Sequence, residues 1–418
     1  MRQPLIQLVI ETSDGTFIRS VRPATLLPEG STGYAAEVAA RHSAASWGLP
    51  DFVFRSTQSL RGSATREIGD AILVVGPAAA SVQVKARLSP TSNEARERSW
   101  LEKNIRRAVS QGRGTIKSLT VGALVTLTNE RGRQLMIDGA HKTWLVVVVL
   151  DHPGVDDYLP AVEKNAVVLL RRDWEFLFEQ LKSTYAVLEY LQRVSGMVPV
   201  PLGQEPLRYY RLAAADASVK PHELDPRIAD FATPWAVPLL PQPPAGHGDF
   251  RNHSVLRAVL EDIATVRLPV GFSHTDMLEV LAAIDAMPVA YRSELGGLWL
   301  SWLREVANAP ADEMVWRFRN VWGHERPYLI FAAAPRYAPW VQDAFSWLVS
   351  FRQQEHLELM PERRGLMTVG ILLTPRADEF GPWDTTIIAV QGDQELTAEE
   401  RVVLEQLWGK LGERVVHA

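Results

Sequence analysis

The chain has 418 residues, of which 46% are hydrophobic and 22% are charged, and its formal net charge is −5. This length predicts two or three domains of about 100–200 residues each, and the acidic balance excludes a protein that coats nucleic acid with its whole surface. Cysteine is absent, which excludes disulfides, thiolate metal sites and cysteine nucleophiles.

The N-terminal part of the chain is predicted to mix strands and helices. A hairpin is expected first, because Ser13-Asp14-Gly15 is a turn signal between two strand-like runs. A continuous apolar run near residue 145 suits a buried strand. The expected elements are strands over 5–11 and 16–21, a helix over 34–46, a strand pair over 70–87, a helix over 94–111, and strands over 121–129, 135–137 and 143–150.

The rest of the chain is divided by proline. Residues 164–196 carry an apolar stripe that predicts a helix, and seven prolines between 219 and 250 predict an extended linker. We therefore expect an N-terminal domain over 1–200, a linker over 219–250 and a C-terminal α/β or α+β domain over 251–418. The elements expected there are helices over 252–265, 274–286, 289–307, 311–319 and 338–353, strands over 328–333, 367–373 and 385–391, and a last helix that begins with a capping box at Thr397.

The strand pair over 70–87 carries polar groups where strands are usually apolar. Side chains alternate between the two faces of a strand, so Ser81, Gln83, Lys85 and Arg87 share one face. Asp70 opens the first strand and lies beside this polar row if the two strands form a hairpin. An acid, an amide and an amine then converge, which is a suitable arrangement for holding a divalent cation against a phosphate.

These residues resemble the PD-(D/E)XK nuclease superfamily in its Gln-x-Lys variant. The family pattern is a helical Glu, an Asp that opens a strand, and an acid or amide two residues before a Lys on the next strand. The matching positions are Glu37, Asp70, Gln83 and Lys85. Asp51, in a literal Pro-Asp, lies too far before Gln83 and ranks below Asp70. The resemblance covers residues 30–150.

The resemblance implies a restriction-endonuclease-like α/β fold, a mixed sheet flanked by helices. It implies that Asp70, Glu37 and Gln83 bind Mg²⁺ or Mn²⁺ and that Lys85 orients or deprotonates the attacking water. It also implies phosphodiester hydrolysis, typically of DNA, with defence against foreign DNA or repair as typical roles.

Each candidate also has a purely structural interpretation. Glu37 and Arg41 have the spacing of a surface pair on a helix, and Asp70 can be a simple turn residue. Gln83 and Lys85 can belong to the solvated face of an edge strand. Because Gln83 replaces an acid, a catalytically inactive nuclease-fold protein that binds nucleic acid or regulates is the alternative function.

The segment after the strand pair is basic. Between Lys85 and Arg133, eleven lysines and arginines accompany four acids. Apolar residues at 101, 105 and 108 predict one buried side of a helix, so the other side can contact nucleic-acid phosphates or pair internally with glutamates. The candidate phosphate contacts are Arg87, Arg98, Lys103, Arg106, Arg107 and Arg113.

The remaining expectations concern location and partners. Neither a signal peptide nor an apolar run of about 20 residues is found, so we expect a cytoplasmic protein without membrane contact. Nine of the 13 tryptophans lie from residue 235 onward. Such aromatic density is typical of a packed core or of an interface, so a homo-oligomer contact, a protein partner or a scaffold role through the C-terminal half stays open.

Overall fold

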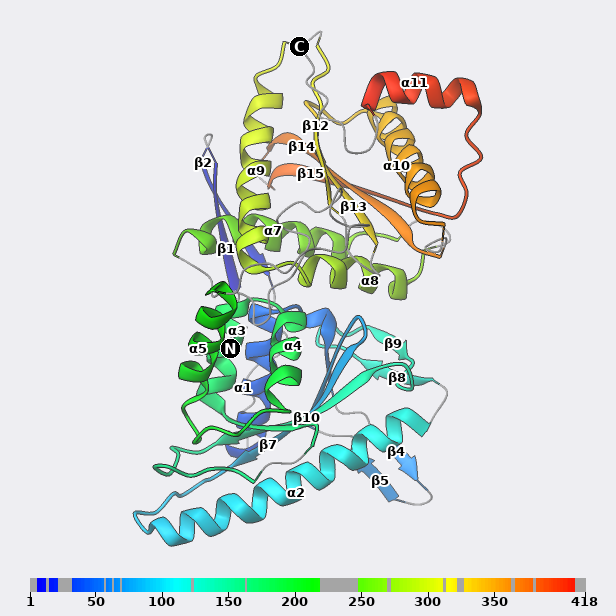
Figure 1. Ribbon diagram of the computed structural model, residues 1–418. Helices are drawn as coiled ribbons and strands as arrows, with labels where there is room; N and C mark the ends of the chain where they lie inside the picture. The colour runs from blue at the N-terminus through cyan, green and yellow to red at the C-terminus, as the bar shows by residue number, and fades with distance from the viewer. Residues whose placement is uncertain are drawn as a thin grey trace.

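The computed structural model describes a mixed α/β chain, as the sequence predicted (Figure 1). Among the residues that it describes, no helix combines the length and apolarity needed to cross a bilayer. The described residues are 6–12, 15–21, 32–55, 58–61, 64–67, 70–121, 124–161, 164–218, 247–268, 272–310, 313–321, 327–361, 365–378 and 381–409.

The N-terminal part contains a five-stranded mixed sheet with the order β11-β10-β7-β6-β3. β3, β6 and β7 form an antiparallel meander, whereas β10 and β11 continue the sheet parallel to β7. Gly76, with φ of 53°, takes the left-handed conformation in the turn between β6 and β7. The strands are β3 (Val53–Arg55), β6 (Ala71–Val75), β7 (Ala78–Ala86), β10 (Thr143–Asp151) and β11 (Ala166–Leu170).

Helices cover both faces of this sheet because its strands are apolar on both faces. Val82 and Val84 of β7 pack with Ala36 of the first helix in one buried cluster. Val146 of β10 and Leu101 pack in another cluster on the opposite face. The helices on the first face are α1 (Thr32–Trp47), α3 (Arg171–Leu181) and α4 (Thr184–Val194), and α2 (Glu94–Val121) covers the second face.

Three short hairpins and two further elements complete this part. The first hairpin confirms the predicted strand pair, although Ser13 and Asp14 of its turn lie outside the described residues. The elements are β1 (Ile6–Thr12) with β2 (Gly15–Val21), the 3-10 helix η1 (Pro50–Phe52), β4 (Gln58–Arg61) with β5 (Ala64–Glu67), β8 (Val125–Thr128) with β9 (Gln134–Ile137), and α5 (Glu205–Ser218).

The C-terminal part has a four-stranded sheet with the order β12-β13-β14-β15, in which only β13 and β14 are parallel. α7 and α8 lie between the two sheets in Figure 1. Thr397 forms a capping box at α11, as predicted, and Ser273 forms another at α8. The elements are α7 (His247–Thr265), α8 (His274–Asp285), α9 (Val289–Ala307), β12 (Arg317–Val321), β13 (Tyr328–Ala333), α10 (Pro339–Leu359), β14 (Met367–Asp378), β15 (Gly381–Gln391) and α11 (Ala398–Trp408).

Two predicted helices were wrong. Residues 164–196 are not one helix, because 166–170 form β11 and Lys182, with φ of 48°, ends α3 before α4. A strand inside a covered sheet can be apolar without alternation, so its pattern merged with that of the helices. The predicted helix over 311–319 is replaced by β12, and residues 311–312 lie outside the described residues.

Both predicted domains contribute to one buried cluster. Trp174 and Leu188 from the N-terminal part belong to it together with Leu281 and Trp299 from the C-terminal part. Most of the predicted linker, residues 219–246, lies outside the described residues, and residues 247–250 begin α7. The division into domains over 1–200 and 251–418 therefore stays a prediction.

Candidate functional site

Asp70 lies directly before β6, at the edge where β7 extends beyond β6. The pairing of these strands ends at Ala71 and Val82, but β7 continues to Ala86. The N–H of Val84 therefore has no partner in β6, and it donates to Asp70 Oδ2 at 2.6 Å. The carboxylate takes the place of a strand residue and is fixed at the edge of the sheet.

Lys85 joins Asp70 at this edge. Its Nζ lies 3.6 Å from Asp70 Oδ2 and donates to the carbonyl oxygen of Val84 at 3.0 Å. The two side chains are 19% and 18% exposed, so both are partly accessible to solvent. The structure thus brings together the acid and the amine that the sequence pattern paired.

Gln83 lies two residues before Lys85 on the same face of β7. It is only 2% exposed, and its Nε2 lies 3.4 Å from Ser81 Oγ. The amide is therefore part of a buried polar row beneath the accessible edge. The burial of Gln83 differs from the alternative prediction, in which Gln83 belongs to the solvated face of an edge strand.

Glu37 lies half-buried on α1, one helical turn before Arg41. Arg41 Nη1 donates to the main-chain oxygen of Asp70 at 3.0 Å, so this part of α1 borders the site. Residues four apart share a helix face, so Glu37 and Arg41 project from the same side of α1. Arg41 itself is buried, unlike a residue of an exposed surface pair.

The donors at this edge are few. In the part of the chain that the structure describes, no group of three or more His, Cys, Asp or Glu side chains could hold a metal ion. Magnesium keeps several waters and binds through one or two carboxylates, and Asp70 presents one carboxylate at this edge. Gln83 shares the α2 face of the sheet with Val148, whereas Glu37 comes from α1 on the other face. Of the three predicted ligands, the structure therefore places Asp70 at the edge beside Lys85. Asp70 Oδ2 has two polar contacts, while Oδ1 makes none among the described residues.

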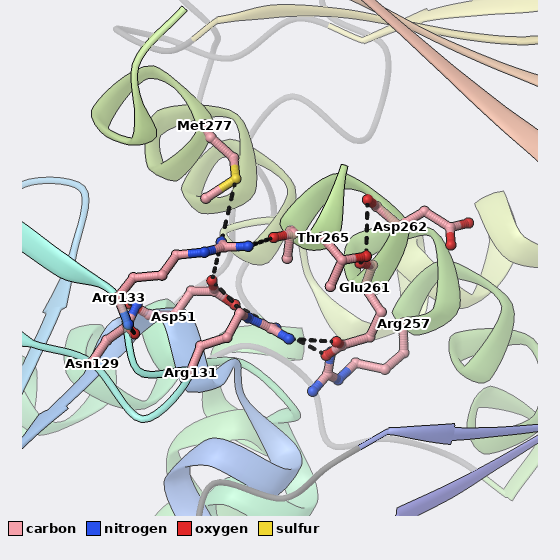
Figure 2. A network of polar contacts seen from close by, with 10 residues as sticks. Asp51, Asn129, Arg131, Arg133, Arg257, Glu261, Asp262, Thr265 and Met277 are labelled. Atoms are coloured by element: carbon pink, nitrogen blue, oxygen red, sulfur yellow. Dashed lines mark hydrogen bonds and ion pairs between the residues drawn. The ribbon is translucent and has the colours of Figure 1, made fainter. Parts of the chain in front are cut away.

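Asp51, the other aspartate considered, is fully buried in an ion network (Figure 2). Its Oδ2 lies 2.6 Å from Arg131 Nη2, and its Oδ1 lies 3.2 Å from Arg133 Nη1. Arg131 continues to Glu261 of α7, with an N–O distance of 2.9 Å. Two guanidinium groups therefore occupy this carboxylate, which agrees with ranking it below Asp70 as a metal ligand.

A second polar cluster, missed in the sequence, lies where β7 and β10 end and α2 begins. Glu97 accepts two hydrogen bonds from Arg87, at 3.0 and 2.9 Å, and pairs with His152 Nε2 at 2.9 Å. Hydrogen bonds from Arg87, His152 and Thr91 hold the pKa of Glu97 well below its usual range. The Trp100 ring stacks on the His152 ring. The Arg87 guanidinium lies over the same tryptophan, 5.6 Å from the Trp100 ring centroid. Arg87, predicted to contact phosphate, is thus engaged within the protein.

The outward face of α2 is basic, whereas its inward face is apolar as predicted. Arg98 pairs with Glu94 at 2.6 Å, which is the internal pairing considered as the alternative. Lys103, Arg106 and Arg107 are exposed and make no ion pair within the described residues. Arg113 is also exposed, and its Nη2 donates to the Lys164 carbonyl oxygen.

A small pocket lies between β11, the start of α3 and the loop before α5. It encloses about 40 Å³, which is room for about one water molecule. Asp173 lines it, and its Oδ2 accepts the N–H of Gly203 at 3.1 Å. Burial raises the pKa of Asp173 to about 6, and Glu205 adds to the effect. The pocket is too small for a nucleotide, so the sheet edge remains the better candidate site.

Comparisons of the chain with protein-family models, with curated proteins and with solved structures found no match. The geometry of its own residues is therefore what bears on function.

Proposed function

We propose that this protein is a metal-dependent nuclease whose site is the edge where β7 extends beyond β6. The observation that carries the proposal is the 3.6 Å separation of the Asp70 carboxylate and the Lys85 ammonium group, both accessible to solvent. Gln83 precedes Lys85 on the same face, and Glu37 comes from the neighbouring helix. This arrangement agrees with the order of the Gln-x-Lys nuclease pattern that the sequence resembles.

The residues at the edge can divide the chemistry of phosphodiester hydrolysis between them. Mg²⁺ or Mn²⁺ bound by Asp70, with Glu37 and Gln83, would neutralise phosphate charge and acidify a water molecule. Lys85 can donate to the attacking water or to a phosphate oxygen and so stabilise the developing negative charge. Asp70 is already fixed by the N–H of Val84, so little reorganisation accompanies the reaction.

Nucleic acid is the substrate that the surface favours. α2 begins beside the site, and its outward face presents Lys103, Arg106 and Arg107 without internal partners among the described residues. Such cations supply sequence-independent attraction to a phosphate backbone. The one aromatic residue of α2, Trp100, is covered by His152 and Arg87, so this helix offers no stacking platform for single strands. A duplex is therefore preferred. The resemblance implies DNA as the substrate and defence or repair as the role, and the cytoplasm is the location expected from the sequence.

Cleavage assays with variants test the proposal. Plasmid DNA and duplex RNA are incubated with the purified protein and Mg²⁺ or Mn²⁺, and then with chelator. We expect metal-dependent cleavage that Asp70→Ala and Lys85→Ala abolish. Asp384→Ala is the matched control, because Asp384 is an exposed carboxylate that is paired with Arg376 at 2.7 Å on β15.

Cleavage that persists in both site variants would remove the assignment of the site. If the protein binds nucleic acid but cleaves it with no metal tested, the alternative function is favoured. In that alternative, suggested by the amide at Gln83, the protein has the nuclease fold but is catalytically inactive.

A further inference from the structure

The turn between β8 and β9 is linked to Asp70 by two buried charges. Arg41 Nη1 donates to the main-chain oxygen of Asp70 at 3.0 Å, and Arg41 Nε lies 2.9 Å from Glu130 Oε1. Glu130 belongs to that turn, and its own N–H donates to the Val53 oxygen of β3 at 2.7 Å. The position of the Asp70 backbone therefore depends on the position of this turn.

The same turn is linked to the C-terminal part of the chain. Arg131 follows Glu130 and reaches Glu261 of α7, while Arg133 donates to the Ala264 oxygen of α7 and lies 3.6 Å from Met277 Sδ of α8. Figure 2 shows both guanidinium groups extending from the turn towards these helices.

Breaking the contacts of the β8–β9 turn with Arg41 or with α7 would leave buried charges without partners. Arg41, Glu130 and Glu261 are all buried, and a buried charge that loses its partner is strongly destabilised. Burial alone would raise the pKa of Glu261, but Arg257 and Arg131 outweigh it and lower this pKa to about 2. Glu261 therefore stays ionised at neutral pH and keeps holding Arg131.

We propose that Arg41 and Glu130 are positioning residues for Asp70, and that α7 sets their position through Arg131. The inference rests on the proposed function, in which Asp70 is a metal ligand. Asp70 is held at two points, its main-chain oxygen by Arg41 and its Oδ2 by the N–H of Val84. Groups that orient a metal ligand typically change metal affinity or activity 10–100-fold. This gives the C-terminal part a role in tuning the site.

Metal titration of cleavage separates positioning from substrate binding. Arg41→Ala and Glu130→Ala are expected to raise the half-activating Mg²⁺ concentration about tenfold or more. The KM for DNA should not change, because α2 is untouched. Glu130→Gln keeps an oxygen acceptor for Arg41 and should restore part of the loss. An unchanged Mg²⁺ midpoint in both alanine variants overturns the proposal.

Hydrogen exchange of the Val84 amide gives a readout that does not need activity. This N–H donates to Asp70 Oδ2, so Arg41→Ala should speed its exchange at least tenfold while the Val148 amide of β10 is unaffected. If the wild-type protein shows no cleavage, the proposed function fails, but this exchange still decides whether Arg41 holds Asp70. Unchanged exchange at Val84 means that it does not.

The link from α7 is tested by substituting Arg131 and, as a control, a second ion-paired arginine, Arg352. Arg131→Met removes the contact with Glu261, and it should raise the Mg²⁺ midpoint about threefold to tenfold. Arg352→Met is the control, because Arg352 is the more deeply buried of the two and its partners, Glu355 and the Trp408 and Gly409 oxygens, all belong to the C-terminal part. An equal rise in the control shows general destabilisation and overturns the role of α7.

Discussion

Arg131 Nη2 lies 2.6 Å from Asp51 Oδ2, although 80 positions separate the two residues in the sequence. Asp51 is fully buried, and Arg133 binds its other oxygen. Buried charges are stable only when they are paired, so η1, the β8–β9 turn and α7 have to be in place together. These ion pairs therefore fix the position of the β8–β9 turn relative to η1 and α7.

Asp51→Ala is expected to lower the free energy of unfolding by about 3–5 kcal/mol, because it leaves two guanidinium groups without their buried partner. Urea denaturation measures this change. Asp384→Ala, which breaks an exposed pair, should cost at most about 1 kcal/mol. Equal effects of the two substitutions would mean that the buried network contributes no more than a surface ion pair.

Asp173→Asn is expected to stabilise the protein at pH 7. Burial raises the Asp173 pKa above its ordinary value, to about 6, so the folded state binds the proton more tightly than the unfolded state. The contribution of Asp173 to stability is therefore fully present below pH 4 and falls as the pH rises towards 6. The amide stays neutral, and the gain at pH 7 should be about 1–3 kcal/mol.

Urea denaturation at pH 4, 5, 6 and 7 checks the Asp173 prediction. The variant should depend less steeply on pH than the wild-type protein between pH 4 and 6. Asp156→Asn, at an exposed carboxylate, is the control and should keep the wild-type slope. A variant with an unchanged slope would show that Asp173 titrates normally.

Two neighbouring glycines of α9 should respond differently to alanine. A Cβ at Gly296 would lie 2.1 Å from the Asn252 main-chain oxygen of α7, whereas one at Gly297 would meet only the Asn252 side chain, with its Nδ2 nearest at 3.0 Å. Gly296→Ala should force the helices apart and cost about 1–3 kcal/mol or more. Gly297→Ala should be within about 1 kcal/mol of wild type, because alanine favours the helix. Thermal unfolding of the pair decides, and similar melting temperatures would contradict the close approach.

Local patterns in the sequence were sufficient for much of the fold. The alternation in β7, the apolar stripe of α2 and the capping box at Thr397 all depend on neighbours within a few residues. β11 was missed because its short apolar run lies directly before the apolar stripe of α3, and the charged residues between them, Arg171, Arg172 and Asp173, are also compatible with a continuous helix. Only tertiary pairing with β10 distinguishes this strand from a helix.

Only part of the candidate site could be predicted from the sequence. Asp70 and Lys85 were paired because a hairpin brings them together. The contact of Arg41 with Asp70 spans 29 positions and that of His152 with Glu97 spans 55. Such contacts depend on how helices pack on the sheet, which no local pattern specifies. The same holds for Arg87 and Arg98, whose charge suggested phosphate but whose acidic partners occupy them.

Gln83→Glu should make the stability of the protein depend on metal. A carboxylate at this buried position is costly, and the metal-free variant should lose about 1–3 kcal/mol. Mg²⁺ bound beside Asp70 would compensate the new charge, so the melting temperature of the variant should rise with Mg²⁺ more than that of the wild-type protein. Calorimetry with Mg²⁺ and with chelator measures both. If the melting temperature of the variant does not change with Mg²⁺, the metal does not bind beside Gln83.

The basic face of α2 should be visible in the salt dependence of binding. Each phosphate contact with duplex DNA adds about 0.9 to the slope of log K against log salt concentration. Arg106→Ala, at an exposed residue without an internal partner among the described residues, should therefore lower this slope by about 0.9. Arg98→Ala should lower it less, because Glu94 already neutralises Arg98.

Binding is measured by fluorescence anisotropy in chelator, so cleavage does not interfere. Arg267→Ala, at an exposed residue beyond α7, controls for the loss of one charge and should keep the wild-type slope. Equal slopes for Arg106→Ala and Arg267→Ala would show that DNA does not lie along α2. A reduced slope only at α2 would show that the duplex lies along this helix, whose first turns are tied to the end of β7 by the contact of Glu97 with Arg87, two positions after Lys85.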